Sequence, residues 1–258
     1  VGLLGCGALG SIIANGLLHD AVPACRLTAV METSRERAEA QLGAPGTGLY
    51  TDNCDDVVNR SDIIVEALPP EMAAAYIMPV LQQGKTLILL SASVLVQYPA
   101  IYKSLQHAPG KLVLPSGSVS GLDAVKAMAH RGIDHAKIST FKPPQALKGA
   151  AYIRDNAITL DNLKEARQIF AGTVYEGAGH FPANINVAAA LSLAGPGPAR
   201  TKMEIWADPE VSNNIHRIEA EGPIGSIQTE TQNRPDPANP KSSQLAAYSV
   251  LAKLQEIA

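Results

Sequence analysis

Three glycines near the start of the chain have the spacing of a phosphate-binding turn. The segment GCGALG follows the apolar stretch VGLL and opens a stretch whose apolar residues recur at helical spacing. In such a turn the first glycine bends the chain, the second lets the backbone approach a pyrophosphate, and the third lets a helix pack closely on a strand. The free N–H groups and the positive dipole end of that helix favour phosphate. The residues predicted to hold a dinucleotide are Gly5, Gly7, Ala8, Leu9 and Gly10.

An acidic residue stands where a dinucleotide would place its adenosine ribose. Glu32 follows the glycine turn by about 20 residues, at the end of the second apolar stretch. Its carboxylate can accept hydrogen bonds from the ribose hydroxyls and would repel a 2′-phosphate, which favours NAD. Arg35 and Arg37 follow closely, and either could bind that phosphate instead. The sequence therefore predicts NAD or NADP as the cofactor.

The sequence contains no signature of a metal site, a catalytic nucleophile or a disulfide. No group of His, Asp and Glu residues has metal-ligand spacing, and no GxSxG-type nucleophile motif occurs, so no metal is predicted. Cys6, Cys25 and Cys54 are interpreted as reduced thiols, because their number is odd and their spacing fits no metal site. Redox chemistry without a metal or a thiol is typical of a protein that uses a nicotinamide.

The first part of the chain alternates between apolar strands and helices. Strands are predicted at Val1–Leu4, Leu27–Met31, Asp62–Leu68, Thr86–Ala92 and Lys111–Leu114. Helices are predicted after the glycine turn, at Glu71–Leu81 and at Val94–Leu105, with Pro79 and Pro99 expected to bend or end the last two. This order predicts a parallel sheet covered by helices on both faces, as in a Rossmann-type domain. We place this dinucleotide-binding domain at residues 1–115.

The pattern changes after about residue 115. Helices are predicted at Gly121–His130, Asn162–Phe170 and Ile185–Leu193. Strands are predicted at His135–Phe141, Thr173–Glu176, Lys202–Trp206, Asn214–Ala220 and Ile224–Thr231. We therefore predict an α/β protein whose Rossmann-type domain is joined to a smaller α+β domain with a mostly antiparallel sheet, at residues 116–240. A last amphipathic helix follows, at Ser243–Ile257.

The composition is that of a globular protein with a large core. The 258 residues are 46% hydrophobic and 17% charged, and the net charge of -3 predicts no surface for nucleic acid. No run of about 18 apolar residues and no signal segment occurs, so we expect no membrane partner and a cytoplasmic location. Because the chain starts inside a predicted strand without an initiator Met, a few residues are expected to precede it.

Several long motifs of the second half carry a resemblance to a known family. PSGSVSGLDAV, FKPPQALKG, FPANINVAAALSLAG, ADPEVSNNIHRIEAEGPIG and NPKSSQLAAYSVL occur in this order. Together with GCGALG, they resemble the L-aspartate dehydrogenase family over most of the chain. The resemblance implies a homodimer and a carboxyl-terminal helix, residues 241–258, that returns to the first domain. It also implies oxidation of L-aspartate with NAD(P)+ to iminoaspartate, which hydrolyses to oxaloacetate and ammonia or supplies NAD synthesis.

The resemblance also implies roles for single residues. His216 in NNIHRI falls on the active-site histidine of the family, and Asn186 in NINVAAA falls on its nicotinamide-contacting asparagine. Ser118 falls on a small residue that touches the cofactor, where the family usually has Ala. An imidazole on an apolar strand face would be neutral and basic, which suits the removal of a proton from a substrate ammonium. Without the resemblance, the residues around His216 are also compatible with a histidine that has only a structural role.

A dicarboxylate substrate requires cations or N–H donors. The candidates are Lys142, Asn239, Lys241 and Ser242, and we expect one of the two lysines to bind a carboxylate. Two segments depart from the family pattern: TRKPP reads TFKPP, which places Phe141 at an arginine position, and SVGAL reads SASVL. These departures leave open another small amino, imino or hydroxy acid as substrate. A non-catalytic NAD(P)-binding sensor is the third hypothesis.

Overall fold

The computed structural model describes residues 1–181, 185–234 and 243–258, which divide into two units. The first unit consists of Val1–Gly117 and Gln244–Ala258, and the second of Ser118–Ser243. Among the described residues, no helix combines the length and apolarity needed to cross a membrane, and no three His, Cys, Asp or Glu side chains form a group that could hold a metal ion.

The described part of the first unit contains a parallel sheet of six strands in the order β3-β2-β1-β4-β5-β6. Its strands are β1 (Gly2–Leu4), β2 (Ala29–Met31), β3 (Tyr50–Thr51), β4 (Ile63–Glu66), β5 (Thr86–Leu89) and β6 (Lys111–Val113). The strand order reverses between β1 and β4, and ligands of such sheets bind beyond the carboxyl ends of the strands at this point. The predicted Rossmann-type fold is confirmed.

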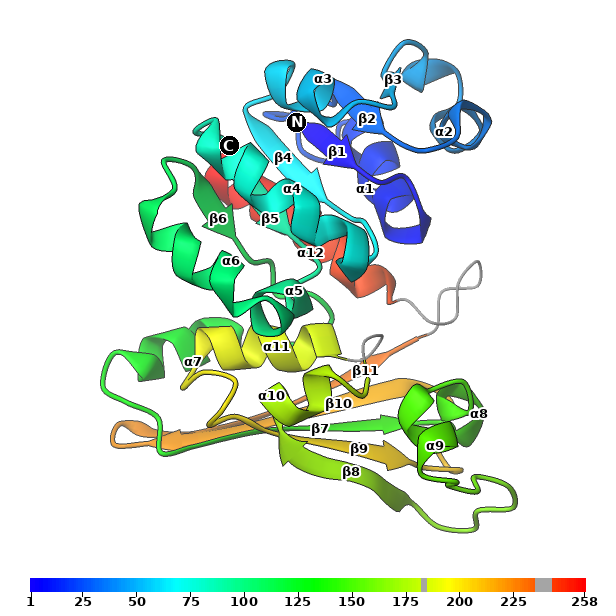
Figure 1. The fold of residues 1–258 in the computed structure, drawn as a ribbon, viewed down its shortest axis with the longest axis vertical. Coiled ribbons are helices and arrows are strands. Elements are labelled where there is room, and N and C mark those ends of the chain that lie inside the picture. The colour runs from blue at the N-terminus through cyan, green and yellow to red at the C-terminus, as the bar shows by residue number, and fades with distance from the viewer. Residues whose placement is uncertain (182–184, 235–242) are drawn as a thin grey trace. The chain divides into compact units, whose positions relative to one another are not determined.

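Helices cover both faces of this sheet (Figure 1). The α-helices of the described part of this unit are α1 (Ala8–Leu18), α2 (Arg35–Leu42), α3 (Cys54–Asn59), α4 (Pro70–Gln82), α5 (Ser93–Gln97), α6 (Pro99–Ser104) and α12 (Gln244–Ile257). The carboxyl-terminal helix α12 packs on α1, where Leu251 of α12 lies against Gly16. Because the apolar face of α12 is part of the same core as α1, the last residues of the chain complete the first unit.

The two prolines act differently on the predicted helices. Pro99 divides the predicted helix Val94–Leu105 into α5 and α6, because proline fits only the first turn of a helix. Pro79 lies inside α4, which nevertheless continues to Gln82. Short elements without a sequence prediction in this unit are β3, α2 and α3.

The described residues of the second unit contain a mixed sheet of five strands, in the order β11-β10-β7-β9-β8. The strands are β7 (His135–Lys142), β8 (Arg167–Thr173), β9 (Lys202–Ala207), β10 (Asn214–Gly222) and β11 (Gly225–Asn233), and only the pair β7–β9 is parallel. Helices α7 (Leu122–Ala129), α10 (Val174–Ala178) and α11 (Ile185–Ala194) pack on this sheet, and α8 (Pro144–Leu147) and α9 (Ala151–Asp155) follow β7 (Figure 1). The predicted α+β architecture is confirmed.

Two predicted elements of the second unit are wrong. The predicted helix Asn162–Phe170 is a turn followed by the edge strand β8, whose pairing with β9 overrides the helix-forming residues of this segment. The predicted strand Thr173–Glu176 instead begins α10. Thr173 and Glu176 form a capping box there, since the Thr173 hydroxyl accepts the Glu176 N–H while the Glu176 carboxylate accepts the Thr173 N–H. The letters TVYE carry this capping signal in the sequence.

Candidate active site

The fold itself requires two of the three glycines in the turn. Gly5 has a φ of +93°, and a Cβ there would lie 2.8 Å from the carbonyl oxygen of Ala67. A Cβ at Gly10 would collide with the carbonyl oxygen of Gly5. Gly7 differs, because it precedes α1 with a φ of -73° and a Cβ there would meet nothing within 4 Å. The space beside Gly7 therefore suits the close approach of a phosphate.

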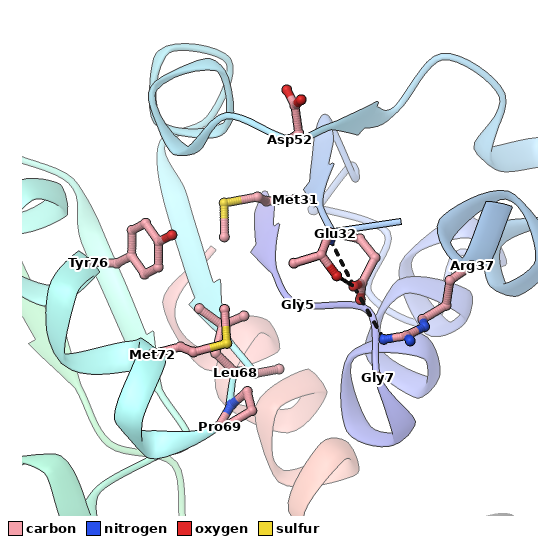
Figure 2. A pocket seen from close by; sticks show the side chains of 12 residues that line it. Gly5, Gly7, Met31, Glu32, Arg37, Asp52, Leu68, Pro69, Met72 and Tyr76 are labelled. Atoms are coloured by element: carbon pink, nitrogen blue, oxygen red, sulfur yellow. Dashed lines mark hydrogen bonds and ion pairs between the residues drawn. The ribbon is translucent and has the colours of Figure 1, made fainter. Parts of the chain in front are cut away.

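A cavity of about 260 Å³ lies beside this turn. Its lining residues lie at or just after the carboxyl ends of β1, β2, β3 and β4, or belong to α2 or α4. Figure 2 shows Glu32 and Arg37 on one side, and Leu68, Met72 and Tyr76 on the other. The largely apolar side offers a surface for a planar ring, and the charged side offers groups for hydroxyls or a phosphate.

Glu32 lies where the sequence places the ribose acceptor. Its side chain is buried, and its carboxylate accepts the Cys6 N–H at 3.1 Å and the N–H and hydroxyl of Thr33 at 2.8 and 2.9 Å. Burial alone would raise the pKa of Glu32, but the hydrogen bonds from Thr33 and Cys6 and the charge of Arg37 outweigh burial and lower it. The side chain is thus an anion that can still accept a hydrogen bond from a hydroxyl.

The two arginines after Glu32 take different positions. The Arg37 guanidinium lies 3.6 Å from the Glu32 carboxylate and lines the cavity. Arg35 instead stacks over the ring of Tyr50, with its guanidinium carbon 4.7 Å from the ring centre, and pairs with Glu39. Of the two, Arg37 is therefore the one placed to meet a 2′-phosphate.

In the second unit, β10 and β7 bring His216 and Thr140 together. The two residues are partners in the antiparallel ladder, and the Thr140 hydroxyl oxygen lies 3.0 Å from Nδ1 of His216. Both side chains are buried on the sheet face that also buries Ile218 and Ala220. The predicted apolar surroundings of His216 are present, and the contact between Nδ1 and the Thr140 hydroxyl holds the ring orientation.

Lys142 lies two residues beyond Thr140 and, by strand alternation, on the same face. Its side chain is 8% exposed, and burial lowers its pKa to about 8. Burial, and then the positive charge of Lys142, lower the pKa of His216 to about 3. The imidazole is therefore neutral at neutral pH, and the lysine ammonium is the cation of this face.

Two family models and several curated proteins match this chain. Residues 123–257 match the model described as aspartate dehydrogenase, C-terminal, and residues 5–115 match the NAD binding domain of homoserine dehydrogenase. L-aspartate dehydrogenase 3 of Bordetella bronchiseptica is 35% identical over 257 residues, which cover 100% of this chain and 94% of that protein. The L-aspartate dehydrogenase of Bradyrhizobium diazoefficiens is 36% identical, over 99% of this chain and 90% of that protein. The chain belongs to the L-aspartate dehydrogenase family.

Solved structures show the same fold. The crystal structure of aspartate dehydrogenase from Thermotoga maritima aligns with a TM-score of 0.77 and 24% identity, covering 99% of this chain and 95% of that one. A homoserine dehydrogenase from Thiobacillus denitrificans aligns with a TM-score of 0.63 and 17% identity, over 99% of this chain and 72% of that one. The predicted family and the predicted cofactor, NAD or NADP, are confirmed.

One departure from the L-aspartate dehydrogenase pattern lies away from the His216 face. Phe141 stands between Thr140 and Lys142, so its side chain projects from the opposite face of the sheet. There it stacks on Trp206 at 5.7 Å between ring centres, and the guanidinium of Arg217 lies over it at 4.7 Å. The Phe141 side chain therefore does not lie on the sheet face that carries His216.

Two of the remaining candidates from the family motifs, Ser118 and Asn186, are described residues of the second unit. Ser118 is buried, and its carbonyl accepts a hydrogen bond from the Asn233 side chain at 2.9 Å. Asn186 lies half-buried in the first turn of α11. Asn239, Lys241 and Ser242 lie outside the described residues.

Two polar residues have no role predicted from the sequence, Thr140 beside His216 and Glu66 beside the glycine turn. Thr140 is recognised only once the register of β7 and β10 is known, because it is 76 residues from His216 in the chain. Glu66 is a buried acid at the carboxyl end of β4, between apolar residues and the segment ALPP. An acid at the end of a continuous apolar strand is the sequence signal that would single it out.

The glycine turn allows folding and cofactor binding to be tested separately. Gly7→Ala should leave the free energy of unfolding nearly unchanged and weaken NADH binding at least about tenfold, since the methyl group takes the place of a phosphate oxygen. Gly10→Ala should instead lower the free energy of unfolding by about 1–3 kcal/mol, because the added methyl group collides with the Gly5 carbonyl. Urea unfolding and NADH fluorescence titration measure the two effects; unchanged NADH affinity in Gly7→Ala would contradict this use of the turn.

Proposed function

We propose that this chain oxidises L-aspartate with NAD+ or NADP+, releasing oxaloacetate and ammonia after hydrolysis of iminoaspartate. The first unit binds the dinucleotide through Gly5, Gly7, Ala8, Leu9, Gly10 and Glu32. The second unit supplies His216 and Lys142, with Ser118 and Asn186 as contacts of the nicotinamide. The observation that carries the proposal is a neutral imidazole beside a buried lysine ammonium, in a chain of this family that also has an NAD binding domain.

Lys142 is the proposed binding group for a substrate carboxylate. A buried ammonium can bind a carboxylate of L-aspartate through a charge-assisted hydrogen bond. Asn239, Lys241 and Ser242 are the further candidates for the second carboxylate. A substrate without a carboxylate would not form this charge-assisted hydrogen bond, which gives selectivity for acids.

His216 is the proposed proton carrier. The nicotinamide, when bound, accepts a hydride from C2 of the amino acid, and this requires a nitrogen lone pair. His216 takes the ammonium proton that masks this lone pair. In the free protein burial and then the Lys142 charge lower the pKa of His216, so a carboxylate that neutralises this charge removes the smaller of the two causes and raises the pKa. The anionic substrate thereby makes the imidazole a stronger base.

The same imidazole can serve the later steps. Once protonated, it can return its proton in the amination direction, or lose it to solvent and then activate the water that hydrolyses the imine. Alternatively, iminoaspartate leaves the protein and supplies NAD synthesis. A homodimer and a cytoplasmic location, which the family resemblance and the composition predict, also stay predictions.

The direct test is turnover with L-aspartate and each cofactor. Formation of reduced nicotinamide, followed by absorbance, should occur with L-aspartate and be far slower with D-aspartate, L-malate and L-glutamate. A faster rate with one of these acids would favour the alternative substrate. NADH binding without turnover of any acid would favour the sensor hypothesis.

Cofactor preference should depend on the pair Glu32 and Arg37. Glu32→Gln removes the charge that repels a 2′-phosphate and frees Arg37, so it should shift relative affinity towards NADPH by at least about tenfold. Arg37→Met should shift it towards NADH. Arg35→Met is the matched control, because Arg35 stacks on Tyr50, and fluorescence titrations with NADH and NADPH compare the variants. Equal effects of the two arginine substitutions would contradict this assignment.

A further inference from the structure

A buried carboxyl group that the proposed chemistry does not use lies beside the glycine turn. Glu66 ends β4 opposite Leu4 of β1, and its side chain is 1% exposed. Oε1 of Glu66 accepts the N–H of Leu68 at 2.7 Å, and Oε2 accepts the N–H of Ser91 at 2.9 Å. The next residue, Ala67, donates its N–H to the Leu4 carbonyl at 2.9 Å. Glu66 thus joins the ends of β4 and β5 next to the cavity, which Ala67 and Leu68 line.

A proton on Glu66 would give a hydrogen to both close oxygen pairs around the Ser91 hydroxyl. The Ser91 hydroxyl oxygen lies 3.1 Å from Oε1 of Glu66 and 2.9 Å from the carbonyl oxygen of Leu68. A hydroxyl has a single hydrogen, so with a Glu66 carboxylate one of these two oxygen pairs has no hydrogen between its atoms. A proton on Oε1 completes the chain, because Glu66 then donates to Ser91 and Ser91 donates to the Leu68 carbonyl. The geometry therefore favours the neutral acid.

The surroundings of Glu66 favour the same state. Burial raises the pKa of Glu66 to about 7. The hydrogen bonds from the Ser91 and Leu68 N–H groups lower the pKa, but burial has the larger effect. The titratable and charged groups at this end of β4 and on the cavity include Cys6, Glu32, Glu71, Tyr76 and Arg37, and the one cation among these five, Arg37, pairs with Glu32. The Cys6 thiol stays protonated, since burial and then the Glu32 charge raise its pKa to about 11. A pyrophosphate on the glycine turn would add negative charge to this region and further disfavour a carboxylate.

We propose that Glu66 holds a proton whenever the dinucleotide is bound, so that cofactor binding takes up a proton from solvent at this carboxyl. The proposal rests on the proposed function, because it requires the pyrophosphate to lie on the glycine turn. Glu66 is a positioning residue: as the neutral acid it links Ser91 to Leu68 and keeps this wall of the cavity in place. At alkaline pH the proton must first be acquired, so cofactor affinity falls as the pH rises.

The test is a calorimetric titration of the full chain with NADH at pH 8, in buffers with different ionisation enthalpies. The wild type should take up more protons per bound NADH than Glu66→Gln, which has no carboxyl to protonate. The dissociation constant of the wild type for NADH should rise by up to about tenfold per pH unit above pH 7. The dissociation constant of Glu66→Gln for NADH should rise less. Asp62→Asn, which removes the exposed acid just before the other end of β4, should behave as the wild type.

Infrared difference spectra of the wild type give a second measurement that needs no variant. NADH binding at pH 8 should produce the carbonyl band of a buried carboxylic acid. Equal proton uptake by the wild type and Glu66→Gln, or NADH binding without this band, would overturn the proposal while leaving the proposed function intact. Failure of NADH to bind at any pH would overturn both.

Discussion

Replacing His216 by Ala should lower kcat for L-aspartate by about 100-fold or more while leaving the dissociation constant of NADH nearly unchanged. The loss is large because no other described histidine is placed on the buried face with Thr140 and Lys142. NADH affinity is kept because the glycine turn and Glu32 belong to the first unit. Stopped-flow or steady-state absorbance gives kcat, and NADH fluorescence titration gives the dissociation constant.

The matched control for this substitution is His135→Ala. His135 lies on the same strand as Thr140, but it is exposed, so its loss should leave kcat and NADH affinity unchanged. A Thr140→Val variant adds a second readout. Without the hydroxyl at Nδ1, the imidazole loses its fixed orientation, so kcat should fall while KM changes little, and Thr140→Ser should restore kcat. If His216→Ala kept wild-type turnover, the proton carrier would have to be another group.

Replacing Lys142 by Met should raise KM for L-aspartate by about 100-fold or more. The side chain is buried, and removing one partner of a buried ion pair costs several kcal/mol, where about 1.4 kcal/mol corresponds to a factor of ten. Lys137→Met is the matched control, because Lys137 is an earlier residue of the same strand whose partner is Glu219 on β10. Initial rates over a range of L-aspartate concentrations separate KM from kcat; a selective loss of kcat would show that Lys142 does not act by binding the substrate.

The pH dependence of KM provides an independent test of Lys142. Burial lowers its pKa to about 8, so below this pH the ammonium is charged and binds a carboxylate, whereas above it the charge is lost. KM of the wild type should therefore rise as the pH increases beyond about 8. Lys142→Arg should abolish this rise, because a guanidinium stays protonated throughout. The same alkaline rise in Lys142→Arg would assign the titration to another group.

The sequence was most informative where local spacing determines the structure. The glycine turn depends on residues that are neighbours in the chain, so Gly5, Gly7 and Gly10 could be assigned roles before the fold was known. The burial of His216 could be predicted because side chains of a strand alternate between its faces. Both predictions require only the type of element and the order of its residues.

Long-range pairing limited the other predictions. The segment Arg167–Thr173 has helix-forming residues before it, and only its ladder with β9 makes it a strand. Thr140 meets His216 through the register of two strands far apart in the sequence, and that register also places Phe141 on the other face. The different positions of Arg35 and Arg37 depend on the ring of Tyr50, which lies on β3. None of these partners is adjacent in the sequence.

The most direct measurement follows the hydrogen at C2 of the substrate. L-aspartate that carries deuterium only at C2 is incubated with the protein and NAD+, and the reduced cofactor is analysed by mass spectrometry. If the chain transfers this hydrogen as a hydride, each molecule of reduced nicotinamide gains one deuterium, and the His216→Ala variant forms the same product far more slowly. Reduced cofactor without deuterium, or none at all while NADH still binds, would contradict oxidation of L-aspartate at C2 by this protein.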